Sequence, residues 1–84
     1  MDTRVAQIGI VVQEGGNVEE LNAVLHAYAP YVIGRMGIPY REKKVNCISI
    51  VLDAPNDAIS ALSGKLGMLN GVTAKAIYAK MPNA

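Results

Sequence analysis

The order of alternating and helically periodic segments constrains the fold of this chain more than any other feature of the sequence. Arg4 to Gln13 (RVAQIGIVVQ) is rich in β-branched residues, alternates along its length and is closed by Gly15-Gly16, so it predicts a strand. Val45 to Asp53 (VNCISIVLD) predicts another strand, and its two apolar faces are typical of a central strand covered on both sides. Val72 to Ala79 (VTAKAIYA) alternates again and predicts the last strand.

A helix is predicted directly after the first strand. Asn17 has the side chain of an N-cap, and Glu20 lies three residues further on, at the spacing of a capping box. Apolar residues then recur at helical intervals from Val18 to Tyr28. Pro30 ends this helix, because the residue before a proline is pushed out of the helical region.

A second helix is predicted to begin at Pro55-Asn56-Asp57, with Asn56 or Asp57 as its cap. It ends at Gly67 or at Asn70-Gly71, because glycine and asparagine are the residues that follow helix ends. Its buried stripe consists of Ala58, Ile59, Leu62 and Leu66.

The segment from Tyr31 to Tyr40 (YVIGRMGIPY) is extended but interrupted by Gly34, Gly37 and Pro39. Because proline cannot donate to a strand ladder, the segment is predicted to be an edge strand or an irregular strand with a bulge. Arg41 to Lys44 then forms a polar turn into the next strand.

The resulting order is strand, helix, strand, strand, helix, strand. With short connections and right-handed crossovers, this order predicts a four-stranded antiparallel sheet with both helices on one face. That is the ferredoxin-like α+β sandwich, written βαββαβ. A length of 84 residues leaves room for a single domain, 1–84.

Two helices cover one face of such a sheet, so its other face is predicted to be bare. Hydrophobic residues make up 51% of the chain, and a domain of this size buries only about 60% of its unfolded surface. A second copy of the chain is the expected cover, giving a homo-oligomer (a dimer or a tetramer) through this face or an edge strand. The residues predicted on the bare face are Val5, Val11, Val45, Cys47, Val51 and Ile77.

The charge balance excludes several classes of partner. Eight basic and seven acidic residues give a formal charge of +1, too little to recruit nucleic acid directly or an anionic membrane surface. The apolar runs are far shorter than the ~20 residues that cross a bilayer. No targeting segment is evident, so the expected location is cytoplasmic.

Catalysis and metal binding are not expected. His26 is the only imidazole, and it lies on the first helix, whereas Cys47 lies mid-strand on the opposite face of the sheet. A nucleophile needs a base within hydrogen-bond reach, and a thiolate or imidazole metal site needs three or four converging ligands. The sequence therefore predicts that the protein is not an enzyme and binds neither a metal ion nor a cofactor.

Two segments are candidates for ligand binding. Arg35 and Tyr40 offer a guanidinium and a phenol to an anionic ligand or a neighbouring chain, although the glycines around them are also explained by a bulge. The loop after the first strand leads into a helix N-terminus, where backbone amides attract anions, although a simple tight turn is the alternative. The candidate ligand-binding residues are Arg35, Gly37, Tyr40, Gly15 and Asn17.

Three runs of the sequence resemble a known family. They are IGRMGIPYREK (residues 33–43), ISIV (residues 48–51) and NDAISALSGKLG (residues 56–67). They resemble the iron-only hydrogenase system regulator family, over nearly the whole chain from Arg4 to Lys80. The resemblance implies a stand-alone ACT-like domain with a ferredoxin-like fold, assembly into dimers or higher oligomers, and a regulatory role linked to hydrogenase maturation.

These expectations leave three functions. The first is a non-enzymatic ACT-like module that binds a small effector at a subunit interface and signals to a protein partner, by favouring one packing over another. The second is a ligand-free oligomeric adaptor. The third, a small enzyme of the ferredoxin-like kind, is disfavoured because the sequence shows no acid–base constellation.

Overall fold

The structure, a computed structural model, describes residues 2–80. All six expected elements are present in the expected order, with one-turn 3₁₀ helices at Ala29–Tyr31 and Arg41–Lys43. No helix within residues 2–80 is long and apolar enough to cross a membrane. The elements are β1 (Arg4–Gln13), α1 (Val18–Ala27), β2 (Val32–Tyr40), β3 (Val45–Ala54), α2 (Asn56–Gly67) and β4 (Val72–Tyr78).

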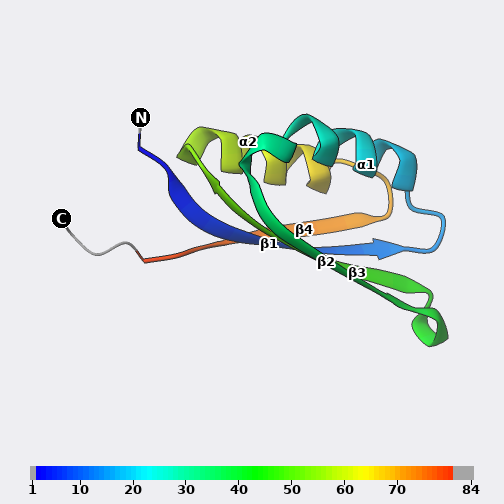
Figure 1. Cartoon of the computed structure of the whole chain (residues 1–84). Coiled ribbons are helices and arrows are strands. Elements are labelled where there is room, and N and C mark those ends of the chain that lie inside the picture. Colours follow the sequence, from blue (N-terminus) through cyan, green and yellow to red (C-terminus); the bar gives the residue numbers. More distant parts are fainter. Residues whose placement is uncertain (1, 81–84) are drawn as a thin grey trace.

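The strands form one antiparallel sheet in the order β2-β3-β1-β4. Both helices lie on the same side of this sheet (Figure 1). The ferredoxin-like α+β prediction is therefore confirmed. The two strands with the strongest alternating pattern, β1 and β3, are the two central strands, and β2 and β4 are the edges.

The core lies between the sheet and the two helices. Every second residue of β1, from Ala6 to Val12, is buried against the helices, and the residues between them are exposed. Full burial of one such side chain is worth about 1.5–3 kcal/mol, so this layer is the main source of stability. The largest fully buried side chains are Ile8, Ile10, Leu21, Ile50, Leu52, Ile59, Leu62 and Leu66.

The two helices start differently. Asn17 caps α1 as predicted, because its Oδ1 accepts the Glu20 N–H at 3.1 Å. For α2 the predicted cap, Asn56 or Asp57, is wrong: Pro55 is the N-cap residue and provides no side-chain hydrogen bond. Proline suits this position because its backbone there is extended (φ −57°, ψ 147°) and its carbonyl accepts the first N–H groups of the helix.

Strand β2 is an edge strand and is also irregular. Val32 pairs with Leu52, but Gly34 pairs with the neighbouring Val51, so Ile33 is an extra residue in the ladder. Both descriptions offered by the sequence are therefore confirmed. The extra residue fixes which side chains of β2 face the helices and which face away from them.

Candidate functional site

The side of the sheet without helices, called the open face here, carries most of the exposed apolar side chains. Register places Ile38 of β2 beside Cys47 of β3, which pairs in turn with Val11 of β1. Among residues 2–80 no segment covers this row. The large apolar residues exposed on the open face are Val11 (39%), Met36 (61%), Ile38 (55%), Tyr40 (46%) and Ile77 (67%).

The sequence identified this face but not all of its members. Of the six residues predicted there, Val11, Cys47 and Ile77 are exposed, and Val5, Val45 and Val51 are half-buried. Met36, Ile38 and Tyr40 were missed, because the sequence prediction did not say which residues of this strand face the helices and which face away. Alternation alone would have grouped them, since Gly34, Met36, Ile38 and Tyr40 are all two residues apart.

Polar groups also lie on the open face. Gln7 Nε2 donates to Ser49 Oγ at 2.7 Å, across the central strands β1 and β3. Thr73 and Lys75 lie on the edge strand β4, and Asp53 lies near the end of β3, beside Val5. The exposed apolar side chains are therefore concentrated toward β2 and the hairpin end of the face, and its charged residues lie at the margin.

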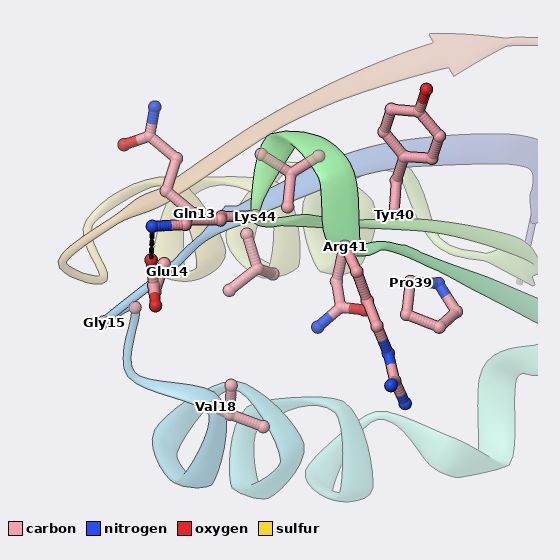
Figure 2. A pocket seen from close by; sticks show the side chains of 12 residues that line it. Gln13, Glu14, Gly15, Val18, Pro39, Tyr40, Arg41 and Lys44 are labelled. Carbon is pink, nitrogen blue, oxygen red and sulfur yellow. Dashed lines mark ion pairs between the residues drawn. The ribbon is translucent and has the colours of Figure 1, made fainter.

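A groove of about 490 Å³ lies at the end of the sheet where the β2–β3 hairpin passes α1 (Figure 2). One wall is the β1–α1 loop, Gln13–Gly16, with Val18 of α1. The other wall is the hairpin, Pro39–Arg41 and Lys44–Asn46, and Val12 contributes to the lining between them. We call this the hairpin groove.

The two walls are joined at Glu14 and Lys44. The Glu14 N–H donates to the Lys44 carbonyl at 2.9 Å, and Lys44 Nζ lies 3.6 Å from Glu14 Oε2 (Figure 2). The two charged side chains are 70% and 68% exposed, so this ion pair contributes at most about 1 kcal/mol. The backbone hydrogen bond is the firmer of the two links.

The loop wall of the groove is a tight turn. Gly15 has φ +83°, and the Gly16 N–H donates to the Gln13 carbonyl at 2.8 Å. A Cβ atom on Gly16 would lie 2.8 Å from a Val12 methyl carbon and 2.9 Å from the Gln13 carbonyl oxygen. The turn described as the alternative at the sequence level is therefore present, and it requires both glycines.

The amides at the start of α1 are already used within the protein. The Asn17 N–H donates to the Asn70 carbonyl at 3.2 Å, and the Val18 N–H donates to the Gly16 carbonyl at 2.9 Å. The Glu20 N–H donates to the Asn17 side chain, as described above. Recognition of an anion in the groove would therefore depend on side chains, of which Arg41 is the nearest cation without an ion pair among residues 2–80.

Tyr40 and Arg41 leave the hairpin in opposite directions. Figure 2 shows the Tyr40 ring pointing away from α1 and the Arg41 side chain pointing toward it. The Tyr40 hydroxyl donates to Glu42 Oε2 at 3.5 Å. The hairpin tip therefore connects the open face, through Tyr40, with the groove, through Arg41.

The five candidate ligand residues do not converge on one site. Gly15 and Tyr40 line the hairpin groove. Arg35 lies away from it, where its Nη2 donates to Asn22 Oδ1 at 3.3 Å, and Gly37 pairs with Ile48. Asn17 serves as the helix cap. Ligand binding by these residues stays a prediction. Arg41 was missed because the sequence placed it in a solvated turn.

His26 and Cys47 lie on opposite sides of the sheet, as expected. Cys47 is an exposed free thiol on the open face, and His26 lies on α1. Within residues 2–80, no group of three or more His, Cys, Asp or Glu side chains is placed to hold a metal ion.

Comparison with known families matches residues 4–76 to the TM1266-like family, described as "Iron-only hydrogenase system regulator, putative". Among solved structures, the chain is similar to "uncharacterized protein TM1266 from Thermotoga maritima", with 35% identity and a TM-score of 0.89. That match covers 94% of this chain and 100% of the other. The search of curated proteins found no match. The family match and the structural similarity thus both agree with the resemblance carried by the three runs of sequence.

Proposed function

Because the chain belongs to the TM1266-like family of iron-only hydrogenase system regulators, we propose that it is a non-enzymatic regulatory module that works as a homo-oligomer and binds a small effector. Family membership supports the regulatory part. The open face supports the homo-oligomer, and the hairpin groove supports the effector site.

A bare apolar row on the open face is the observation that carries the proposal. Ile38, Cys47 and Val11 form one row across β2, β3 and β1, and nothing in the described part of the chain shields it. An apolar patch of this kind in water favours association, because contact with a second copy removes it from solvent. A two-fold dimer through the face would bring each row against the same row of its partner.

The face is a better assembly surface than the β2 edge. Pro39 has no N–H to donate to a strand of another subunit, and the irregularity at Ile33 disturbs the ladder at the other end of β2. We therefore favour face-to-face packing over edge pairing. A tetramer would need a further surface in addition to the face.

The hairpin groove is proposed as the effector site. An effector bound there would contact Arg41, and the adjacent Tyr40 belongs to the proposed interface. Binding that favours one position of the hairpin would favour one packing of the open face, which is all that a regulatory shift requires. We propose that the resulting assembly acts in the cytoplasm on a protein partner of the hydrogenase system.

The assembly proposal is tested by light scattering across a wide range of protein concentrations. We expect the wild-type chain to be a dimer or larger and the Ile38→Glu variant to be a monomer, because a buried carboxylate would lack a partner. Met68→Glu is the matched control, since Met68 is 88% exposed and lies at the end of α2, away from the open face. A wild-type chain that is monomeric throughout would contradict the proposal.

A ligand-free adaptor is the second candidate, and the occupied amides at the start of α1 favour it. A thermal-shift screen with amino acids, nucleotides and divalent metals separates the two, because a ligand of the native state raises its melting temperature. A shift that is lost in Arg41→Ala supports the effector site. No shift with any compound, together with intact assembly, supports the adaptor.

A further inference from the structure

A second hollow lies between α1 and the edge strand β2, separate from the hairpin groove. Its volume is about 330 Å³, and none of its lining residues also lines the groove. It lies on the helix side of the sheet, because Arg35 pairs with the buried Ile50 and lies on the same side of the strands. Assembly through the open face would leave it accessible. We call it the α1–β2 hollow.

The rim of the α1–β2 hollow is polar and carries positive charge without negative charge. Arg35 of β2 and His26 and Asn22 of α1 line it, and no aspartate or glutamate does. The Arg35 guanidinium makes one side-chain hydrogen bond, to Asn22 Oδ1 at 3.3 Å, and no ion pair among residues 2–80. A guanidinium has five N–H donors in a planar fork, so most of this one remains available to a ligand.

The rest of the lining is apolar. Leu25 of α1 and Ile50 of β3 are already buried, with exposures of 4% and 1%, so the apolar surface that a ligand can cover belongs to the exposed Ala29 and the half-buried Val32. A ligand that places only a charged group at Arg35 would leave these two side chains in contact with water. A ligand that adds a short hydrocarbon tail would cover them and gain from their burial.

These two features together specify a ligand class. We propose that the α1–β2 hollow binds a small monocarboxylic acid with a short apolar tail, its carboxylate on Arg35 and its tail against Ala29 and Val32. Arginine matches a carboxylate because its fork and the two oxygens are both planar. An α-amino acid fits less well, because the lining has no carboxylate to receive the ammonium group. The hollow is at the small end of ligand pockets, which suits such a molecule.

Isovalerate is the probe, with three matched compounds. Isovaleramide keeps the tail without the charge, acetate keeps the charge without the tail, and leucine adds an ammonium group. We expect isovalerate to bind more tightly than all three by calorimetry. In amide NMR spectra we expect its largest shifts in residues 22–26 and 32–35, rather than in residues 13–18 and 39–46 of the groove.

Substitution then tests the role of Arg35. Arg35→Gln should weaken isovalerate binding about tenfold or more, since it removes a charge-assisted hydrogen bond, and Arg41→Gln should leave it unchanged. Arg35 is exposed, so both variants should fold, which their melting curves will verify. Equal binding of isovaleramide or inorganic phosphate, an unaffected Arg35→Gln variant, or shifts confined to the groove would each overturn the proposal. Assembly is measured separately by light scattering. A monomeric wild-type chain would therefore contradict the homo-oligomer but not isovalerate binding in the α1–β2 hollow.

Discussion

Ile10 and Val11 are neighbours in β1, yet their side chains meet opposite surroundings. Ile10 faces the helices and is 2% exposed, whereas Val11 faces away from them and is 39% exposed. The same contrast separates Ile50 from Cys47 and the other open-face residues of β3. Both sides of the central strands are apolar, but only one is covered by the chain itself. The comparison teaches that the helix side holds the monomer together, while the open face leaves apolar side chains in contact with solvent.

The largest expected effect is on stability, and it should differ between the two sides of β1. Ile10→Ala should lower the free energy of unfolding by about 2–5 kcal/mol, because it leaves a cavity under the helices. Val11→Ala should cost less than about 1 kcal/mol, because its side chain is partly in water. Chemical denaturation of both variants at low protein concentration provides the measurement. Similar losses in the two variants would show that the two faces are not different in kind.

A smaller effect sharpens the description of the covered side. Asn17→Ala should destabilise the protein by about 1 kcal/mol, because the Glu20 N–H loses its acceptor. Asn56→Ala is the matched control: Asn56 also stands at a helix start, but its Oδ1 accepts from Arg4 Nη1 at 3.3 Å rather than from the helix backbone. Its expected cost is below about 0.5 kcal/mol. Equal losses of stability for the two variants in thermal melts would indicate that Asn56 caps α2.

The smallest effect concerns the hairpin, which belongs to both sides. Lys44→Ala should change stability by no more than about 0.5 kcal/mol, because the ion pair with Glu14 is exposed and the backbone link between the two residues survives. Stability of the wild-type chain should accordingly change little with added salt. A loss of several kcal/mol in Lys44→Ala would mean that the ion pair, rather than the backbone, closes the groove.

The parts of the fold that follow a simple period were predictable from the sequence. β1 and β3 alternate over their whole length, and the apolar positions of α2 recur at helical spacing, so their faces follow from counting. The α2 cap was not predictable in this way. Pro55, Asn56 and Asp57 all suit a helix start, and only the backbone shows that Pro55 precedes the first turn.

The candidate site was predictable only in part. Arg35 and Tyr40 are five residues apart, which in a strand separates them by about 16 Å and places them on opposite faces. Alternation therefore argued against grouping them. The groove itself depends on a long-range contact, between Glu14 and Lys44, and no local pattern in the sequence reports that contact.

The extra residue at Ile33 has a consequence for how this chain tolerates deletions. Removal of Ile33 would restore a one-to-one ladder, because Val32 and Gly34 already pair with the consecutive residues Leu52 and Val51. Ile38 would stay on the open face, and Arg35 would stay on the helix side. Loss of this one codon should therefore be tolerated, whereas loss of one residue within β3, whose pairing with β1 contains no extra residue, would turn the following side chains to the wrong face.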